Sequence, residues 1–385
     1  MNSNQALRLL NDLTPAQFLA VYWQKKPLLI KNAIPGFTGL LTPEELAGLA
    51  CEDEVQSRIV QKKNDQWTLS NGPFDEADFS RLPNKDWTLL VQSVNHFLPE
   101  ATDLLSQFDF IPHTRLDDLM VSYAPDGGGV GPHFDSYDVF LLQGQGKRLW
   151  RISEQTDLSL VEGAPLRILK QFDTSQEWLL EAGDMLYLPP QIAHWGIAVS
   201  DGSEDCMTYS IGFRAPKHQE LASEFLGFMQ DRLHQNLTQL DGIYQDADLA
   251  LQAHPAEISV QMINKVSENL NKIQWSDDDV GQFLGCYLSE PKQHIVFVPN
   301  KKMALKTFKE KLSKSDLTLD LKSQMLFLKD TFFMNGEAVN LHQATAHHLK
   351  TLADTRYLPQ TLLLDENLVS VLHEWYMAGY VHFVQ

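Results

Sequence analysis

Apolar residues at helical spacing alternate with short apolar runs over the first hundred residues. The segments TPAQFLAVYW (14–23) and TPEELAGLA (42–50) each begin with a capping threonine, a proline at the first helical position, and Gln17 or Glu45 three residues after the cap. The apolar spacing of DWTLLVQSVNHFLP (86–99) also predicts a helix that ends at Pro99. RIVQKKNDQWTL (58–69) predicts a hairpin.

The pattern changes between residues 118 and 214, where short β-rich runs alternate with turn residues. The runs are LMVSYA, YDVFLLQ, KRLWRI, DMLYLP, HWGIAVS and MTYSIGF. No long helical pattern interrupts them. Closely spaced strands of this kind are typical of an antiparallel sandwich or barrel.

Helical patterns return after Pro216. HQELASEFLGFMQDRL (218–233) and EISVQMINKVSENLNKI (257–273) predict two helices that could bury their apolar faces against the barrel or against another subunit. SDDDVGQFLGCYL (276–288) begins a further module, in which Asn335-Gly336 predicts a hairpin turn. This module also contains two helix-like segments, HQATAHHLKTLAD and VLHEWYMAGYVHFVQ. Helices combined with a small hairpin resemble a winged helix.

Length and charge narrow the class of protein. A chain of 385 residues predicts two or three domains. Residues 291–385 hold 11 Lys and Arg and 9 Asp and Glu, a balance of +2. Because the net charge of the whole chain is −19, the remaining residues carry −21. An acidic body disfavours nucleic acid and favours basic partners, although the acidity could serve solubility alone.

Cysteine use and hydropathy predict a cytosolic protein. The three cysteines are far apart, which argues against a disulfide framework or a zinc finger and suits a reducing compartment. MNSNQALRLLNDLTPAQ lacks the basic and apolar regions of a secretory signal. No apolar run approaches the length of a membrane span, so no membrane association is expected.

The segment GVGPHFDSYDVFLLQGQGKRLW (129–150) places His133 and Asp135 two residues apart after a glycine-rich run. Side chains at i and i+2 of a strand point to the same face, so both could face the inside of a barrel. An iron(II) site with open positions commonly uses two histidines and one carboxylate. The pair alone is weak evidence, because 13 His and 50 acidic residues produce roughly 1.7 such pairs by chance.

A second histidine has a setting that suits a third ligand. GDMLYLPPQIAHWG (183–196) predicts a turn, a strand, a loop bounded by prolines, and His194 at the start of another strand. This order can bring His194 to the pair from the opposite side of a barrel. A hydrogen-bonded loop histidine is the alternative for His194 taken alone. His347 and His348 have no nearby acidic partner and are read as surface or packing residues.

Arg148 lies in KRLWRI (147–152), where it shares a strand face with Trp150 and Ile152. An arginine on an apolar face needs a partner, because a buried unpaired charge is costly. The planar guanidinium matches a carboxylate, such as the distal carboxylate of a dicarboxylate that chelates iron through its keto-acid end. A solvated strand arginine is the alternative.

Three segments resemble the JmjC-type 2-oxoglutarate- and iron(II)-dependent oxygenases: FLAVYWQKKPLLIKNAI, GGGVGPHFDSYDVFLLQGQGKRLW and LYLPPQIAHWG. More narrowly, they resemble the cupin-like bacterial ribosomal oxygenases, which hydroxylate an arginine of a large-subunit ribosomal protein. The resemblance implies an α+β fold with a double-stranded β-helix (jelly-roll) core. It implies an oxygenase domain at 1–216 with its core at about 96–214, a helical dimerisation segment at 217–274, and a winged-helix-like domain at 275–385.

Carried over position by position, the resemblance implies that His133, Asp135 and His194 are the catalytic iron ligands. It likewise implies that Arg148 binds the distal carboxylate of 2-oxoglutarate. The expected cofactor is Fe(II), with 2-oxoglutarate and dioxygen as cosubstrates. The expected reaction converts 2-oxoglutarate to succinate and carbon dioxide and hydroxylates an unactivated C–H bond.

Two further residues are candidates for substrate binding. A guanidinium substrate needs an acceptor near the iron, and Asp126 in the loop YAPDGGG could supply one, with a solvated turn aspartate as the alternative. Tyr137 would share the inward face of Asp135 in a regular strand and could line the substrate pocket. Barrel packing is the alternative for Tyr137.

We therefore expect a cytoplasmic, homodimeric hydroxylase of a basic ribosomal protein, with arginyl 3-hydroxylation favoured. The same chemistry on a ribosomal histidine or asparagine, or demethylation of N-methyl-lysine, stays open. A non-catalytic cupin-like regulator that binds a small molecule and a metal-dependent sugar isomerase are the alternatives from other classes. No direct nucleic-acid binding is expected, because residues 291–385 contain no evident Arg- and Lys-rich recognition helix.

Overall fold

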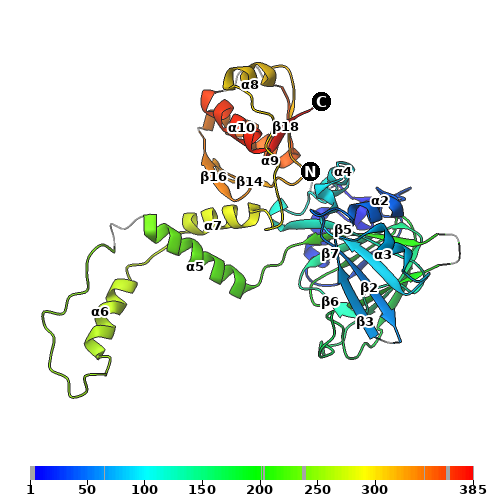
Figure 1. Ribbon diagram of the computed structural model, residues 1–385, viewed down its shortest axis with the longest axis horizontal. Coiled ribbons are helices and arrows are strands. Elements are labelled where there is room, and N and C mark those ends of the chain that lie inside the picture. The colour runs from blue at the N-terminus through cyan, green and yellow to red at the C-terminus, as the bar shows by residue number, and fades with distance from the viewer. Residues whose placement is uncertain are drawn as a thin grey trace.

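The protein consists of a β-sheet domain, a helical arm and a smaller C-terminal α/β domain (Figure 1). The computed structural model describes residues 5–64, 66–200, 202, 204–235, 240–341, 343–360 and 365–384. Asp65 of the predicted hairpin, His342 and Gln385 lie outside these residues. Within the described part of the chain, no helix has both the length and the apolar character needed to cross a membrane.

The first domain contains two antiparallel sheets. The larger has the order β1-β10-β7-β12-β5-β4-β2-β3, and the smaller has the order β6-β11-β8-β9. The strands of the larger sheet are β1 (Leu28–Ile30), β2 (Ser57–Lys63), β3 (Gln66–Asn71), β4 (Trp87–Val91), β5 (Leu116–Ala124), β7 (Asp138–Gln145), β10 (Met185–Leu188) and β12 (Cys206–Phe213). Those of the smaller sheet are β6 (His133–Phe134), β8 (Lys147–Ser153), β9 (Gln176–Leu180) and β11 (Ala193–Val199).

This arrangement confirms the predicted double-stranded β-helix. The six β-rich runs between 118 and 214 all form strands. Side chains from both sheets meet in one apolar cluster, in which Val139 and Leu141 of β7 lie with Trp150 and Ile152 of β8. The larger sheet also includes β1 to β4, which precede the predicted start of the core at about residue 96.

Short helices cover the N-terminal part of this domain. They are α1 (Pro15–Val21), α2 (Pro43–Leu49), α3 (Glu76–Ser80) and α4 (Glu100–Ser106), with 3-10 turns η1 (Arg8–Leu10), η2 (Val94–His96) and η3 (His113–Arg115). The predicted caps of α1 and α2 are confirmed, because Thr14 and Thr42 each form a capping box with the residue three positions later.

The predicted helix over 86–99 is wrong. Trp87–Val91 forms β4, which pairs with β2 on one side and β5 on the other. Every residue of β4 is buried, so its apolar run has the composition of a strand covered on both faces. Such a run cannot be told from a buried helix by spacing alone. Only Val94–His96 forms a helical turn, of the 3-10 type.

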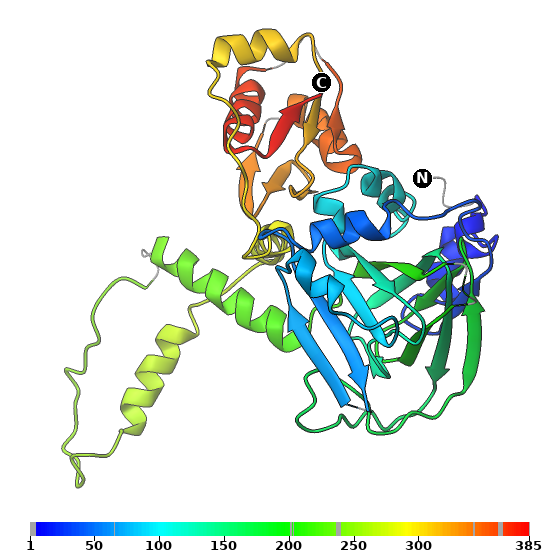
Figure 2. The ribbon, with the colours of Figure 1, turned by 45° about the vertical axis from the view of Figure 1, so that its right-hand side comes forward.

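Both views show an arm that extends away from the two domains (Figures 1 and 2). The arm consists of α5 (His218–Gln235) and α6 (Val260–Leu270), and α7 (Asp277–Ser289) follows it. Phe225 of α5 packs against Phe283 of α7, with 5.4 Å between the ring centroids. Ser276 caps α7 as predicted. No residue of α6 is buried in the described structure.

The C-terminal domain has its own apolar core, built from helices and two small sheets. Its elements are α8 (Leu305–Leu312), β13 (Leu317–Leu319), β14 (Met325–Leu328), β15 (Thr331–Met334), β16 (Glu337–Asn340), α9 (Gln343–Thr355), β17 (Tyr357–Leu358), α10 (Glu366–Ala378) and β18 (Val381–Phe383). Asn335 and Gly336 form the predicted β15–β16 turn with φ of 51° and 92°.

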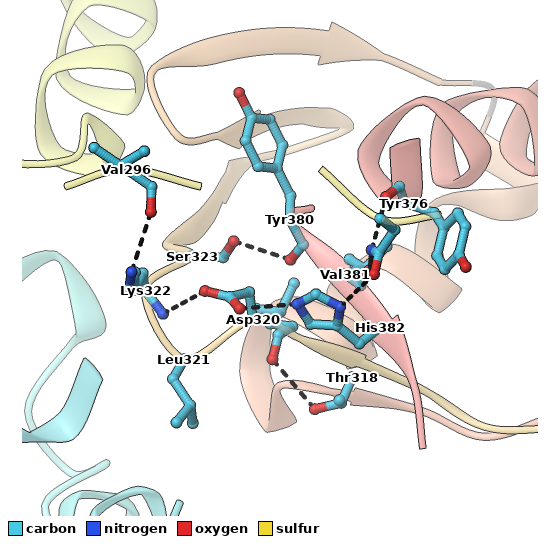
Figure 3. Close-up of polar contacts among 12 residues, drawn as sticks. Val296, Thr318, Asp320, Leu321, Lys322, Ser323, Tyr376, Tyr380, Val381 and His382 are labelled. Atoms are coloured by element: carbon cyan, nitrogen blue, oxygen red, sulfur yellow. Dashed lines mark hydrogen bonds and ion pairs between the residues drawn. The ribbon is translucent and has the colours of Figure 1, made fainter. Parts of the chain in front are cut away.

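Polar contacts connect the strands of this domain to each other and to the β-helix domain. His382 lies 2.8 Å from Asp320, and the Lys322 ammonium donates to the Val296 carbonyl (Figure 3). The same ammonium forms an ion pair of 2.7 Å with Glu54 of the first domain. The two domains therefore contact each other through side chains as well as through the connecting helices.

Candidate metal centre and cosubstrate cavity

Strand pairing brings the three predicted metal ligands together. β11 pairs with β6 so that His194 lies directly opposite His133. Asp135 follows the last residue of β6, so it reaches the site from the end of the strand, not from a regular i, i+2 position within it. One ligand atom from each of the three side chains lies within 4.8 Å of the other two. This separation suits a single ion bound between them.

Backbone carbonyls orient both imidazole rings. Nδ1 of His133 lies 2.9 Å from the Gly131 carbonyl, and Nδ1 of His194 lies 2.9 Å from the Ile192 carbonyl. A carbonyl can only accept, so Nδ1 carries the proton and the Nε2 lone pair is left for a metal. The two Nε2 atoms lie 3.9 and 3.5 Å from the Asp135 carboxylate.

The electrostatic setting favours neutral imidazole at His194. Burial, and after it the neighbouring His133, lower the pKa of His194 from 6.5 to about 4. A metal ligand must present a deprotonated nitrogen, so a ring that stays neutral at neutral pH is ready to bind. The donor set of two imidazoles and one carboxylate fits Fe(II) with coordination positions left open.

Small residues on β11 make room for the larger side chains of β8. Gly196 pairs with Trp150, and Ala198 pairs with Arg148. A Cβ atom at Gly196 would lie 2.7 Å from the Trp150 ring, which is closer than side chains can approach. At the preceding glycine-rich run, a Cβ at Gly128 would lie 2.0 Å from the Trp87 carbonyl. The glycine-rich run therefore packs closely against the backbone at Trp87, just before β6 begins.

Arg148 is buried on the inner face of β8, as predicted, with only 5% of its surface exposed. Its Nε donates to the sulfur of Cys206 at 3.2 Å. Its Nη2 is buried and has no hydrogen-bond partner among the described residues. A buried guanidinium N–H without an acceptor is costly, so this group fits a site for an anionic ligand.

A cavity of about 340 Å³ joins the ligand cluster to Arg148. His133, Asp135 and His194 line it together with Arg148 and Trp150. This volume lies at the lower end of the range for small-molecule sites. The cavity can accept a dicarboxylate with one end at the metal ligands and the other at the guanidinium.

The two substrate candidates lie in different places. Tyr137 lines the cavity, and its pKa is raised first by desolvation and second by the nearby Asp135 carboxylate. Asp126 is not among the described residues that line the cavity; its carboxylate accepts a hydrogen bond from the Ser200 amide at 3.0 Å. This hydrogen bond holds Asp126 against the segment that follows β11, and a role of Asp126 in substrate binding stays a prediction.

Several cavity residues were not singled out from the sequence. Arg58 of β2 and Arg167 of the β8–β9 loop line the cavity. A buried polar group behind Arg148, formed by Gln143, Cys206 and Thr208, was also missed. The signal for the last group was present, because Gln143 and Thr208 are polar residues within otherwise apolar strand runs.

Two family models match the chain. One, a JmjC domain, matches residues 103–221. The other, a ROXA-like winged helix, matches residues 271–382. These matches confirm the predicted order of a JmjC-type oxygenase domain followed by a C-terminal winged helix.

Similar proteins point to the same family. The chain is 38% identical over 286 residues, 73% of each protein, to the ribosomal protein uL16 3-hydroxylase of Escherichia coli K12. It is 40% identical over 235 residues to a probable ribosomal oxygenase of Haemophilus influenzae, covering 60% of this chain and 57% of that protein.

A solved structure extends the likeness to the whole fold. The E. coli ribosomal oxygenase YcfD in complex with cobalt and 2-oxoglutarate superposes with a TM-score of 0.82 at 32% identity, covering 97% of this chain and 99% of that one. The prediction of a 2-oxoglutarate- and iron(II)-dependent dioxygenase is thereby confirmed. The chain belongs to the JmjC-domain ribosomal oxygenases.

Proposed function

We propose that this enzyme hydroxylates C3 of an arginine in the large-subunit ribosomal protein uL16. One structural observation supports the chemistry most directly: the His133, Asp135 and His194 cluster shares a cavity with the unpaired guanidinium of Arg148. The target protein is inferred from the E. coli relative, whose name specifies uL16 3-hydroxylation. The choice of arginine rests on the resemblance to the bacterial ribosomal oxygenases.

In this proposal each cavity residue has one task. His133, Asp135 and His194 hold Fe(II), and the carbonyls that accept from the two Nδ1–H groups fix the ring orientations. Arg148 binds the distal carboxylate of 2-oxoglutarate. When bound, iron and 2-oxoglutarate supply the chemistry that activates dioxygen and yields succinate, carbon dioxide and a hydroxylated substrate.

Tyr137 is the proposed substrate contact. Tyr137 lines the cavity and the residue is 38% exposed, so it lies where a side chain entering from outside would pass. A guanidinium can pack over a tyrosine face through a cation–π contact. Asp135 is the one carboxylate among the described residues that line this cavity, and it is assigned to the metal.

We further propose that the enzyme is a cytoplasmic homodimer whose arm binds a second copy. The domain limits are 1–216 for the oxygenase domain, 217–274 for the dimerisation segment and 275–385 for the winged-helix domain. Exposed apolar residues on α6 support this interface: Val260 is 71% exposed, Ile263 51% and Leu270 59%. A monomer rarely leaves such a contiguous apolar face in water.

The partner in catalysis is then a basic ribosomal protein, and no direct nucleic-acid binding is proposed. The net −19 of the chain favours a basic partner over phosphates. Sedimentation equilibrium tests the dimer: substituting Ile263 and Leu270 by Asp is expected to give monomers, and an unchanged dimer would contradict the proposed interface.

Succinate formation and mass spectrometry test the reaction. Purified protein is incubated with Fe(II), ascorbate and 2-oxoglutarate, with and without peptides that span the arginines of uL16. We expect peptide-dependent succinate and a peptide that gains one oxygen on an arginine. Fragment spectra that place the oxygen on histidine or asparagine would change the assigned residue. No succinate under any condition would favour a binding protein over an enzyme.

A further inference from the structure

A buried polar cluster connects the two sheets behind Arg148. Gln143 of β7 and Thr208 of β12 lie opposite each other in the larger sheet, and Cys206 precedes Thr208 by two residues. Gln143 is 0% exposed, Thr208 1% and Cys206 2%. The Cys206 sulfur accepts from Nε of Arg148, which belongs to the opposing sheet. One sulfur atom thus fixes the arginine from behind.

The donors and acceptors of this cluster can be assigned in one consistent way. The Thr208 hydroxyl donates to Oε1 of Gln143 at 3.0 Å, which defines the orientation of the amide. The amide nitrogen then donates to the Gln145 carbonyl at 2.7 Å and to the Cys206 sulfur at 3.2 Å. Gln143 therefore holds the sulfur in the position where it receives the Arg148 N–H.

A thiol differs from a carboxylate in what it leaves available on the arginine. A carboxylate behind Arg148 would form an ion pair and offset its charge. A neutral sulfur is a weak acceptor that orients the group and leaves the positive charge for the cavity. Because Nε is occupied, the edge formed by Nε and Nη2 is closed. The edge formed by the two Nη nitrogens remains for a carboxylate.

We infer that Cys206 is a positioning residue, whose sulfur directs the two Nη groups of Arg148 toward the distal carboxylate of 2-oxoglutarate. This inference rests on the proposed function, because it needs Arg148 to bind that carboxylate. It adds a determinant of cosubstrate affinity that never touches the cosubstrate. Gln143 holds the sulfur through its amide nitrogen, and Thr208, which also lines the cavity, orients that amide.

Calorimetric binding to the Mn(II)-loaded protein tests the inference without turnover. Cys206→Ala removes the acceptor and should weaken 2-oxoglutarate binding about tenfold, as the loss of one orienting bond to a charged group would. Oxalate chelates the metal but has no distal carboxylate, so its affinity should not change. Cys206→Ser keeps an acceptor and should recover part of the loss. Cys51→Ala, a cysteine outside the cavity, is the matched control.

A double-mutant cycle shows whether the sulfur acts through Arg148. In the Arg148→Lys background the guanidinium Nε is absent, so Cys206→Ala should cause no further loss of 2-oxoglutarate affinity. An equal loss in both backgrounds would overturn the inference, as would a loss shared by oxalate, which indicates a general distortion of the cavity. Thermal unfolding of each variant identifies any that fold poorly, and Cys206→Ser then carries the test.

The outcomes separate this inference from the function on which it rests. If Arg148→Ala leaves 2-oxoglutarate affinity unchanged, the cosubstrate assignment itself is wrong. If Arg148→Ala weakens binding while neither Cys206 variant does, only the positioning role is wrong.

Discussion

The two domains each contain a histidine next to an aspartate, and they differ in which nitrogen atoms remain unpaired. In the C-terminal domain His382 uses both ring nitrogens. Its Nδ1 lies 3.0 Å from Asn300, and its Nε2 lies 2.8 Å from Asp320 (Figure 3). In the β-helix domain His133 and His194 use only Nδ1, and both Nε2 atoms face the Asp135 carboxylate. The same residue types thus form a structural link in one domain and a set of metal donors in the other.

The partners of the ring nitrogens distinguish a metal site from a structural pair better than the residue types do. A hydrogen-bonded pair at a domain surface stabilises the strands that carry it. Two imidazole nitrogens and a carboxylate that converge beside a cavity form a donor set that suits a metal ion. Four substitutions, taken in order of expected effect, measure how far the comparison holds.

The largest effect is expected from His133→Ala. Loss of one of three protein ligands should lower metal affinity by more than about 100-fold and remove turnover, because two donors cannot hold the ion in the cavity. Calorimetric titration with Mn(II) and a succinate assay measure the two effects. Metal affinity within a factor of about three of wild type would contradict the ligand assignment.

Arg148→Ala should have the next largest effect. Removing a charge-assisted bond to the distal carboxylate should raise the 2-oxoglutarate requirement by about 10- to 100-fold. Metal affinity should stay unchanged, because Arg148 is not a ligand. Steady-state kinetics at varied 2-oxoglutarate concentration test this expectation, with Arg151→Ala on the opposite face of β8 as the control. An unchanged requirement would show that another residue binds this carboxylate.

His96, at the junction of the two domains, is an intermediate case. Its buried Nδ1 has no partner among the described residues, yet the charges that act on its pKa are those of basic residues. Burial, and then Lys292 and Arg356, lower the pKa of His96 from 6.5 to about 4. An unpaired nitrogen alone therefore does not make a metal site.

The pKa of His96 leads to a prediction about pH. The unfolded chain takes up a proton before the folded chain does, so the contribution of His96 to stability is complete above pH 6.5 and is lost as the pH falls toward 4. His96→Asn should reduce this acid-dependent loss by about 2 kcal/mol. Urea unfolding at pH 7 and pH 4.5 measures it. Identical pH dependence in the variant would rule out His96 as the source.

The smallest effect is expected from Asp320→Ala. It breaks the bond to His382 and the bond from the Lys322 amide, and should lower the free energy of unfolding by about 1 kcal/mol. Metal affinity and turnover should match wild type, since the pair lies outside the cavity. Loss of metal binding in this variant would contradict a purely structural role for the Asp320–His382 pair.

Local interactions explain what the sequence predicted well. The caps at Thr14 and Thr42 depend on hydrogen bonds that span three residues. The inward position of Arg148 follows from strand alternation with Trp150 and Ile152. The ligand residues were found from composition, spacing and family resemblance, whereas their convergence needed β6 to pair with β11, which lies far from it in the sequence.

The errors and omissions share a different cause. Residues 86–99 were predicted as a helix because the sequence does not show that β4 is covered on both faces. Arg58 and Arg167 were missed as cavity residues because they come from β2 and from the β8–β9 loop, which only the packing of the chain brings to the cavity.

The sequence by itself determined the strands between residues 118 and 214, the helix caps and the residue types that can bind iron and a dicarboxylate, since short-range hydrogen bonds and side-chain alternation decide these features. The tertiary structure alone decided which polar groups remain unpaired. The contact between Arg148 and Cys206 joins two sheets and residues 58 positions apart, so no local pattern could encode it. Chemistry in this protein depends on those unpaired groups, and they exist only once the two sheets pack together.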